Sequence, residues 1–444
     1  RAGTLGTLAS KTAFGFVAKY LEGRGIAVSR AEMDWLINKC IGVKRTTGQH
    51  PGGIIVIPRE YEVYDFTPVQ RPADDVKSEI VTTHFPFEFL HDTILKLDIL
   101  GHDVPTKYKV MERYTGVDPL SIPMNDKRVM SLFLSTEALG VTPKMINSET
   151  GTFGMPEFGT KFVRQMLLDT KPRCFSDLLQ ISGLSHGTDV WLGNAQELIK
   201  KEICTISDVV GTRDNIMVYL IYKGLEKSTA FKIMEDVRKG RGLKPEYVEA
   251  MLDCGVPKWY IDSCKKIKYM FPKAHAAAYV MSALRLGWYK VYYPMEFYAA
   301  FFTVAPGGFD GEIVMKGRAH INAVMAAIEE KGNETTQKEA ETLSALQLAN
   351  ECLARGVEFL PVDLYKSDPK AYLPENGKIR LPFMSLSGLG ETAAQRIAAA
   401  REESEISSVE DLRSRAQLTK TVIEVLSRSG ALDKLSETDQ ISFF

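Results

Sequence analysis

The chain has 444 residues and a formal net charge of −1, with 45% hydrophobic and 25% charged residues. This composition is typical of soluble globular proteins, and the length allows roughly two to four domains. A surface that is basic throughout is excluded, and no apolar run is long enough to cross a bilayer, so we expect a cytoplasmic protein without a membrane partner. Because the chain opens on Arg1 without a signal-like segment, we also expect it to begin inside a larger protein.

The first third of the sequence mixes strand-like runs with helical patterns, which indicates an α+β region. Residues 52–57 (Gly-Gly-Ile-Ile-Val-Ile) predict a buried strand. Residues 94–100 alternate in polarity, and this places Lys96 and Asp98 on one face of a second strand. Helical patterns flank these strands at residues 32–40 and 107–114.

Asp98 is the acidic residue that says most about chemistry. A lone carboxylate among apolar neighbours is costly unless it is paired or binds a metal. Strand carboxylates suit Mg²⁺, which takes oxygen ligands from one or two acids and from substrate phosphates, and Lys96 could neutralise such a phosphate. A salt bridge between Lys96 and Asp98 is the structural alternative, and one carboxylate cannot hold two metals.

Residues 46–53 (Thr-Thr-Gly-Gln-His-Pro-Gly-Gly) predict a polar, glycine-rich turn that enters the first strand. Its small residues would permit the backbone to approach a ligand closely. The segment is not a phosphate-binding Walker loop, because no Gly-Lys-Ser/Thr follows it. A purely structural turn is the alternative.

From about residue 120 to 345 the pattern is mostly helical. Apolar spacings of three and four predict amphipathic helices at residues 161–168 and 230–237. The apolar and aromatic stretch 275–303 predicts a central buried helix that is interrupted near Pro294. The polar stretch 333–350 predicts a helical connection between domains.

Within this helical region, Lys273 and His275 stand at a predicted helix start, and Tyr279 follows one turn later. A helix N-terminus with nearby cations can bind an anion, and a tyrosine there could stack on a base or sugar. A core helix with a hydrogen-bonded histidine is the alternative. Local basic clusters can bind DNA despite the net charge, or can simply be solvated faces. Two are present here, formed by Lys265, Lys266, Lys268 and Lys273, and by Arg238, Lys239, Arg241 and Lys244.

The last hundred residues return to mixed structure. Asn376-Gly377 between two apolar segments predicts a β-hairpin. Gly388-Leu-Gly390 before a helix at residues 391–401 is typical of a helix-hairpin-helix unit, whose backbone N–H groups can bind phosphate without reading sequence. Residues 418–435 repeat this plan. The chain then ends on the apolar tip Gln-Ile-Ser-Phe-Phe at residues 440–444, which would either bind a partner or fold back on its own domain.

Taken together, these motifs resemble the PolC-type bacterial DNA polymerase III alpha subunits, a family of C-family replicative DNA polymerases. The resemblance covers the whole chain, more loosely between residues 305 and 380. The matching segments occur in family order at residues 45–56, 95–103, 156–160, 181–198 and 265–279.

The resemblance implies an α+β multidomain architecture. Residues 1–120 would form the C-terminal part of a palm domain, and residues 121–345 a mostly helical fingers domain. Residues 346–436 would form a duplex-binding domain with tandem helix-hairpin-helix units. Residues 437–444 would be a tail that binds the sliding clamp.

The resemblance also implies roles for individual residues. Asp98 would be the third palm carboxylate, a catalytic residue and a ligand of Mg²⁺. The other two palm acids would lie upstream of Arg1, so we expect this chain alone to be inactive. Val104 stands where a second acid usually follows Asp103. Nucleotide would be bound by Lys96, Ser182, Arg213, Lys273, His275 and Tyr279, with Ser182 in a loop. DNA would be bound by His50, Lys265, Lys266, Lys268, Gly388 and Gly390. The clamp would be bound by Gln440, Ile441, Phe443 and Phe444.

The function implied is template-directed DNA synthesis in chromosomal replication, by nucleotidyl transfer from a dNTP to a primer 3′-OH. The expected partners are primer-template DNA, dNTPs, the sliding clamp (beta subunit) and other replisome subunits, at the nucleoid. The alternative is a non-catalytic DNA- and clamp-binding fragment of a broken or truncated polymerase gene.

Overall fold

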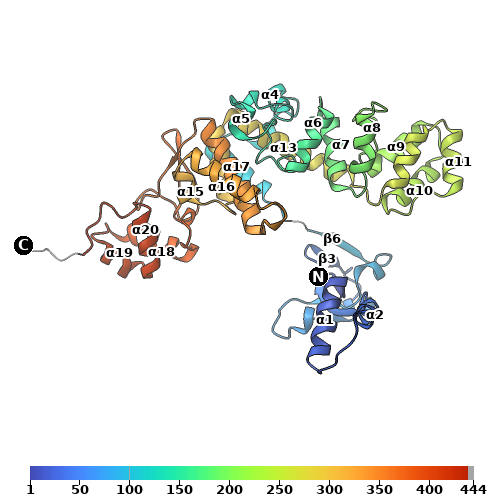
Figure 1. Cartoon of the computed structure of the whole chain (residues 1–444), viewed down its shortest axis with the longest axis horizontal. Coiled ribbons are helices and arrows are strands. Elements are labelled where there is room, and N and C mark those ends of the chain that lie inside the picture. Colours follow the sequence, from blue (N-terminus) through green and yellow to red (C-terminus); the bar gives the residue numbers. More distant parts are fainter. Residues whose placement is uncertain (100, 439–444) are drawn as a thin grey trace, which may run out of the picture. The chain divides into compact units, whose positions relative to one another are not determined.

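The computed structural model describes residues 1–99 and 101–438, which form two compact units (Figure 1). Unit 1 comprises Arg1–His102, and unit 2 begins at Asp103. This division falls earlier than the predicted boundary at residue 120, because helix α3 (Val104–Thr115) packs within unit 2. Met111 of α3 is completely buried there, and the Lys107 ammonium lies 4.2 Å from the centre of the Phe301 ring. Among the described residues, no helix combines the length and apolar character needed to span a membrane.

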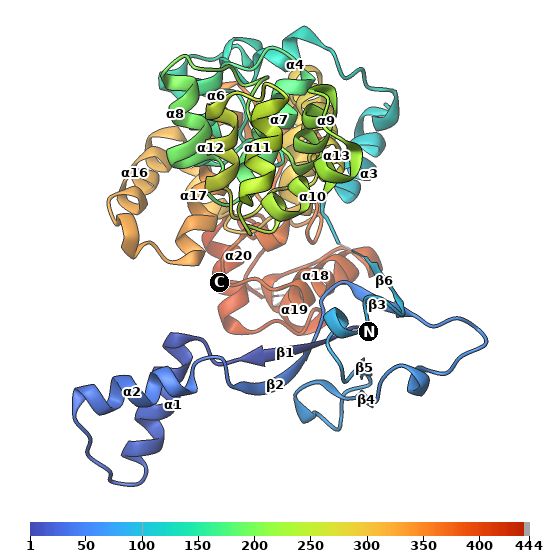
Figure 2. The same cartoon turned by 90° about the vertical axis from the view of Figure 1, so that its right-hand side faces the viewer.

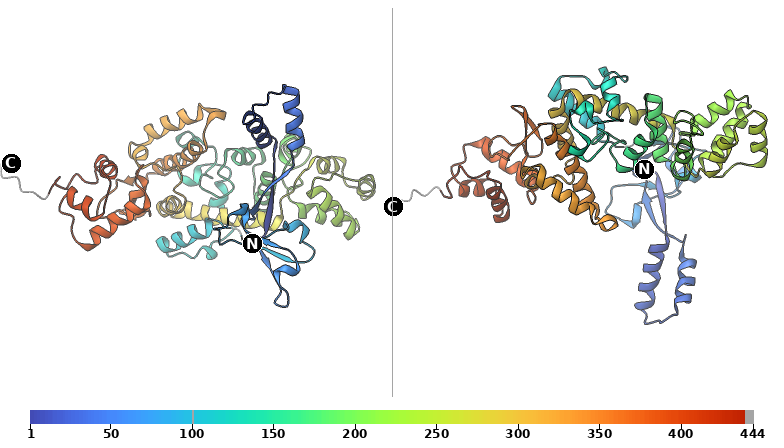
Figure 3. Two further views of the ribbon diagram at one scale, coloured as in Figure 1. Left: turned by 90° about the horizontal axis from the view of Figure 1, so that it is seen from below. Right: turned by 45° about the horizontal axis from the view of Figure 1, so that its top comes forward.

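Unit 1 combines a helical hairpin with three two-stranded antiparallel sheets, β1–β2, β3–β6 and β4–β5. Helices α1 and α2 pack against each other at the end of the β1–β2 ribbon (Figures 2 and 3). A capping box starts α2, since Ser29 and Glu32 each accept a hydrogen bond from the other's backbone N–H. The elements are β1 (Gly3–Thr7), α1 (Ser10–Glu22), α2 (Arg30–Cys40), β2 (Lys44–Gln49), β3 (Gly53–Val56), β4 (Val69–Gln70), β5 (Thr82–Thr83) and β6 (Leu95–Asp98).

The strands of unit 1 are more exposed than their sequence patterns predict. β3 was predicted as a buried strand, but Val56 is exposed. In β6, Leu95 and Leu97 are 65% and 51% exposed, so Asp98 does not lie among buried apolar neighbours. The predicted turn at residues 46–53 is also shorter, because its first part pairs with β1 as strand β2. A two-stranded sheet has too little apolar surface to bury both faces, whatever its periodicity.

Unit 2 is mostly helical, as predicted, and one extensive hydrophobic core runs through it. It also holds a small sheet in the order β7-β9-β8, with β7 parallel to β9. The elements after α3 are α4 (Lys127–Ser131), α5 (Pro143–Ile146), α6 (Lys161–Thr170), α7 (Phe175–His186), α8 (Gln196–Lys200), α9 (Arg213–Tyr222), α10 (Lys227–Arg238), α11 (Pro245–Asp253), α12 (Lys258–Lys266), α13 (Lys273–Tyr292), α14 (Pro294–Val304), α15 (Gly311–Met315), α16 (Arg318–Glu329), α17 (Gln337–Ala354), β7 (Phe359–Leu360), β8 (Leu373–Glu375), β9 (Lys378–Arg380), α18 (Glu391–Glu403), α19 (Val409–Arg415) and α20 (Lys420–Arg428).

The predicted central helix with a break near Pro294 is confirmed as α13 and α14. Proline lacks a backbone N–H, and it is therefore well suited to the first position of the new helix. The helix predicted at residues 333–350 is present as α17, but the prediction that it merely connects domains is wrong. α17 packs on α5, α14 and α16, and its Leu346 and Cys352 side chains are completely buried. The first turns of α17 are polar, and this polarity led to the prediction of a linker.

The C-terminal part of unit 2 contains the predicted hairpins. Asn376 and Gly377 join β8 to β9 with φ angles of 51° and 78°, which suits a tight two-residue turn. Gly388, with a φ of 93°, lies before α18, and Gly390 is the N-cap residue of that helix. The Leu389 side chain between them is buried, while both glycines are exposed. The hairpin thus leaves its backbone accessible while one leucine anchors it.

Candidate active site

The side chains of Lys96 and Asp98 lie on one face of β6, as the alternation predicts. β6 pairs with β3 so that Gly53 is opposite Asp98 and Ile55 is opposite Lys96. The Lys96 ammonium lies 3.3 Å from Oδ1 of Asp98. The Asp98 side chain is 45% exposed, so it can accept a further ligand from solvent without being unpaired in the protein. The pairing is therefore compatible both with a structural salt bridge and with an ion-binding carboxylate.

His50 is held beside this pair by backbone hydrogen bonds. Its Nδ1 accepts from the N–H of Gly53 at 2.7 Å and from that of Gly52 at 3.3 Å. Since the Nδ1 lone pair is occupied, this atom has no proton to share with Asp98, whose Oδ1 is 4.0 Å away. A Cβ on Gly53 would lie 2.8 Å from His50 Nδ1 and 3.1 Å from Lys96 Cδ. Glycine is thus required for this packing.

An open pocket surrounds the carboxylate, and sequence reasoning missed most of its lining. The Lys96 ammonium lies 4.9 Å from the centre of the Phe87 ring, a cation–π contact that no local pattern signals. Among the described residues, no cluster of three or more His, Cys, Asp or Glu is arranged to hold a metal ion. The pocket is lined by Phe87, Glu88, His91, Ile94, Leu95, Lys96 and Asp98.

A second cluster of predicted residues meets at the start of α13 in unit 2. The backbone N–H of Lys273 donates to Oδ2 of Asp214 at 2.7 Å, so a carboxylate already occupies part of the helix N-terminus. The Arg213 side chain is 3.8 Å from that same oxygen, and the Arg213 N–H donates to the Phe271 carbonyl. Lys273 and His275 are exposed. The fold therefore brings predicted nucleotide-binding residues from two distant segments together, and it adds an acid that we did not predict.

The prediction that Ser182 lies in a loop is wrong, because this residue lies inside helix α7. Its side chain is 1% exposed, and its hydroxyl has no hydrogen-bond partner among the described residues. α7 packs so closely here that a Cβ on Gly183 would lie 2.2 Å from the Gly211 carbonyl oxygen. The loop was implied by the family resemblance, whereas Gly183 here permits α7 to pack closely against the backbone of Gly211. In this conformation Ser182 cannot contact a ligand.

His186, at the end of α7, is a residue whose surroundings the sequence did not reveal. Its ring stacks on Phe271, with centroids 4.6 Å apart and planes inclined by 25°, and Tyr279 lies 6.2 Å away with nearly parallel planes. Nε2 is 2.7 Å from the Glu157 carboxylate. The hydrogen bond that His186 donates to Glu157 raises the pKa of His186, against the opposing effect of burial. Tyr279 also contacts His275, at a centroid distance of 6.4 Å.

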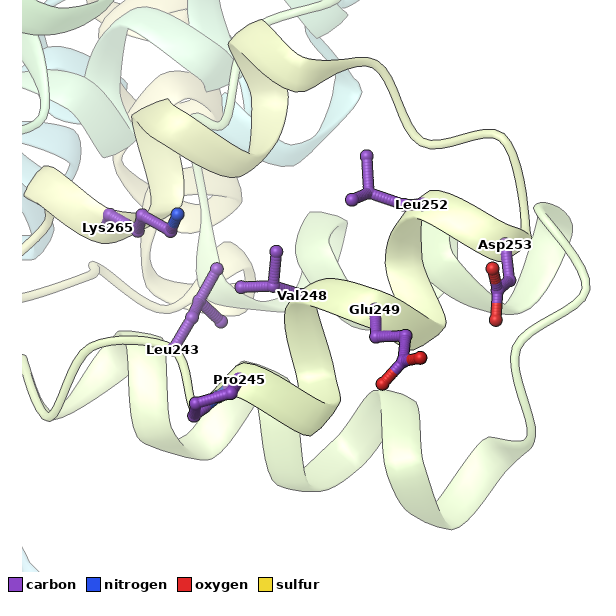
Figure 4. Close-up of a pocket in the computed structure, with 7 residues that line it drawn as sticks. All are labelled: Leu243, Pro245, Val248, Glu249, Leu252, Asp253 and Lys265. Carbon is purple, nitrogen blue, oxygen red and sulfur yellow. The ribbon is translucent and has the colours of Figure 1, made fainter.

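The basic clusters near this site are largely engaged within the protein. Lys266 donates to the Gly193 carbonyl at 2.7 Å. Arg238 forms two 2.7 Å hydrogen bonds to Glu235 and lowers the pKa of that carboxyl to about 2. Lys265 borders a pocket between α11 and α12 (Figure 4). Lys268 is exposed. This pocket is lined by Leu243, Pro245, Val248, Glu249, Leu252, Asp253 and Lys265.

The predicted clamp-binding residues lie outside the described residues. These are Gln440, Ile441, Phe443 and Phe444.

Comparisons with known proteins assign the chain to a family along its whole length. A family model for the "Bacterial DNA polymerase III alpha NTPase domain" matches residues 2–101, and one for the "Bacterial DNA polymerase III alpha subunit finger domain" matches residues 104–254. A "Helix-hairpin-helix motif" model matches residues 356–440. The DNA polymerase III PolC-type proteins of Listeria welshimeri and Bacillus subtilis are each 55% identical over all 444 residues, and that of Clostridium perfringens is 52% identical. The chain spans 31% of the length of each of these relatives. On this colinear match, the chain belongs to the PolC-type DNA polymerase III family.

Proposed function

We propose that this chain contributes to a DNA-directed DNA polymerase that adds deoxynucleotides to a primer 3′ end during chromosomal replication. One observation carries the proposal. Asp98 is a half-exposed carboxylate, 3.3 Å from a lysine ammonium, in a chain that is 55% identical throughout to proteins named DNA polymerase III PolC-type. A carboxylate next to a cation, open to solvent on one side, is the arrangement expected where a metal ion and a phosphate are bound together.

Mg²⁺ is the cofactor that we propose for Asp98. Magnesium takes hard oxygen ligands, commonly from one or two carboxylates together with substrate phosphates. Asp98 offers such oxygens, since its side chain is 45% exposed and lines an open pocket. When bound, the ion would neutralise charge that develops on the phosphate oxygens during transfer. Lys96 would hold Asp98 in place and present its ammonium to a phosphate oxygen.

In unit 2 we propose that the cluster at the start of α13 binds the incoming dNTP. The exposed Lys273 and neighbouring Arg213 would bind phosphate oxygens, and His275 and Tyr279 would contact the sugar or base. Asp214 would keep the helix start and Arg213 in a fixed relation, since it contacts both. Buried Ser182 is left out of this proposal.

We propose domain roles by analogy with the same family. Residues up to His102 would belong to the palm, the helices from α3 onward to the fingers, and the hairpin units to a duplex-binding domain. Exposed Gly388 and Gly390 would offer backbone N–H groups to DNA phosphates, a contact that needs no basic surface. His50 would join them as a DNA contact at the edge of β3. The tail from residue 437 would bind the sliding clamp, and through it other replisome subunits.

A chimera tests the proposal with this chain as it exists. Residues 1–444 replace the matching segment of the Bacillus subtilis relative, which is 55% identical, and the purified protein (the chimera) is assayed for primer extension in Mg²⁺. Template-directed extension supports the proposal. A chimera that binds primer-template DNA with the affinity of the parent but does not extend it would reject catalysis. That outcome would favour the alternative, a non-catalytic DNA- and clamp-binding module. Its supporting observation is that the described residues contain no cluster of three or more His, Cys, Asp or Glu arranged to hold a metal ion.

A further inference from the structure

Both ring nitrogens of His186 face hydrogen-bond acceptors. Nε2 lies 2.7 Å from Oε2 of Glu157, and Nδ1 lies 2.9 Å from the carbonyl oxygen of Ser182. Nδ1 is also 2.9 Å from the Ser185 hydroxyl, which itself donates to the Ser182 carbonyl and so has lone pairs to offer. A carbonyl and an ionised carboxylate can only accept, so both contacts are hydrogen bonds only when both nitrogens carry a proton. The geometry therefore describes an imidazolium.

The backbone of Glu157 indicates that its carboxylate is placed for this contact. Its φ of 69° lies in the left-handed region, which a residue other than glycine, asparagine or aspartate seldom adopts. The neighbouring Phe158 is completely buried and packs edge-on against Phe133, with ring centroids 5.0 Å apart. This anchor holds the turn in position. A glutamate in such a conformation points to a use for its side chain, and the Glu157 carboxylate pairs with His186.

The protonated ring belongs to a stack of three nearly parallel rings, His186, Phe271 and Tyr279, that reaches α13. A cation over an aromatic face is attracted by the ring quadrupole, and the His186 ring lies over Phe271 at 4.6 Å. The Phe271 and Tyr279 rings are 6.3 Å apart and inclined by 20°. Through its carbonyl, Phe271 also accepts the Arg213 N–H. The stack thus fixes the segment that carries Lys273.

We propose that His186 is a positioning residue for the nucleotide-binding face of α13, acting as an imidazolium held by Glu157 and bearing on Phe271 and Tyr279. The ionisable groups that face it among the described residues are Glu157, at Nε2, and Tyr279, whose ring is nearly parallel. His275 lies beside both Phe271 and Tyr279. The Glu157 hydrogen bond raises the pKa of His186, which favours the cation. The proposed role of His186 in nucleotide binding rests on the proposed function. The protonation state of His186 and its stacking on Phe271 and Tyr279 do not depend on that function.

The first test uses the 444-residue chain labelled with ¹⁵N-histidine and ring-labelled tyrosine. His186 and Tyr279 signals are assigned from the His186→Gln and Tyr279→Phe spectra. We expect both His186 nitrogens to be protonated at pH 7. Glu157→Gln should lower the pH of the titration midpoint and shift the Tyr279 ring signals. Glu112→Gln, which removes an exposed ion pair with Lys109, is the matched control and should change neither. A neutral His186 at pH 7, or unchanged signals in Glu157→Gln, would overturn the proposal.

The second test measures dNTP use by the chimera. Glu157→Gln and His186→Gln should each raise the KM for dNTP by about tenfold and leave primer-template affinity unchanged. In the unmodified chimera, KM should rise with pH as His186 loses its proton, and both variants should remove that dependence. The positioning role is overturned if the chimera is active and these substitutions change neither its KM for dNTP nor the pH dependence of that KM. A chimera without extension activity would contradict the proposed function instead, and the NMR shifts of Tyr279 would still decide whether His186 positions the stack.

Discussion

The ammonium of Lys290 lies 2.7 Å from Oε1 of Glu351, and both side chains are completely buried in unit 2. Lys290 also donates to the carbonyls of Gly151 and Phe153, each at 2.7 Å, so its three protons have three acceptors. Burial lowers the pKa of Lys290 to about 8, although Glu351 acts in the opposite direction. The Tyr298 hydroxyl donates to the same glutamate oxygen. The pair therefore joins α13, α14 and α17 at the centre of the unit.

Breaking this pair should strongly destabilise unit 2. Lys290→Met would leave Glu351 charged and buried without its partner, which typically costs about 3–5 kcal/mol in unfolding free energy. The free energy is measured by urea unfolding with tryptophan fluorescence in a Trp35→Phe background. Trp35 is the tryptophan of unit 1, so the remaining signal comes from unit 2 alone.

Two further variants sharpen this prediction. Lys109→Met removes an exposed pair with Glu112 and should have a far smaller effect. Adding Glu351→Leu to Lys290→Met removes the isolated charge and should recover part of the loss. A Lys290→Met protein as stable as Lys109→Met would contradict the central role of the buried pair.

Asp98→Asn should abolish primer extension by the chimera and leave primer-template binding nearly unchanged. The amide keeps the size of the side chain but removes the negative charge that a metal ion requires. Extension is followed on a labelled primer and binding by fluorescence anisotropy. Asp92→Asn, at a fully exposed acid near the same strand, serves as the control and should extend normally. Normal extension by Asp98→Asn would remove this residue from the metal site.

Lys273→Ala should weaken nucleotide use by the chimera. If the exposed ammonium binds the triphosphate, KM should rise, kcat should fall, or both, with DNA affinity almost unchanged. Its backbone hydrogen bond to Asp214 survives the substitution, so the start of α13 should stay intact. Steady-state kinetics over a range of dNTP concentrations measures the effect. Lost duplex affinity with normal nucleotide kinetics would instead place Lys273 in the DNA channel.

The His186–Glu157 pair should make stability depend on pH in a defined direction. Because the folded pKa of His186 is raised above its unfolded value, its contribution is fully present below the unfolded value of about 6.5. It is lost as the pH rises through the folded pKa. The difference in urea midpoint between the unmodified chain and His186→Gln should therefore shrink from pH 5.5 to pH 9. A difference that grows with pH would show that the histidine is buried in its neutral form.

The C-terminal tail should bind the sliding clamp. A peptide of residues 435–444 carries Gln440 and three apolar anchors, and we expect micromolar affinity for the clamp of a PolC-containing bacterium, about −8 kcal/mol. A peptide with both Phe443→Ala and Phe444→Ala is the matched control and should not bind. Deleting residues 440–444 from the chimera should reduce clamp-stimulated processivity far more than single-nucleotide addition. Full processivity after the deletion would refute the assignment.

Local sequence by itself determined the features that depend on short-range geometry. The break at Pro294 follows from a missing N–H, and the turn at Asn376-Gly377 follows from its positive φ angles. The shared face of Lys96 and Asp98 follows from the two-residue period of a strand. These features were predicted correctly because each depends on residues only a few positions apart.

The tertiary structure alone decided which residues distant in the sequence come into contact. Asp214 lies 59 residues before Lys273 in the sequence, yet it caps α13, and no periodicity predicts that contact. Ser182 is buried where α7 packs closely at Gly183 against the segment that precedes α9, and Glu157 meets His186 because a buried phenylalanine anchors its turn. Hydrophobic packing is non-directional, so the sequence indicates which faces are buried. It does not indicate which distant polar groups come together when those faces pack.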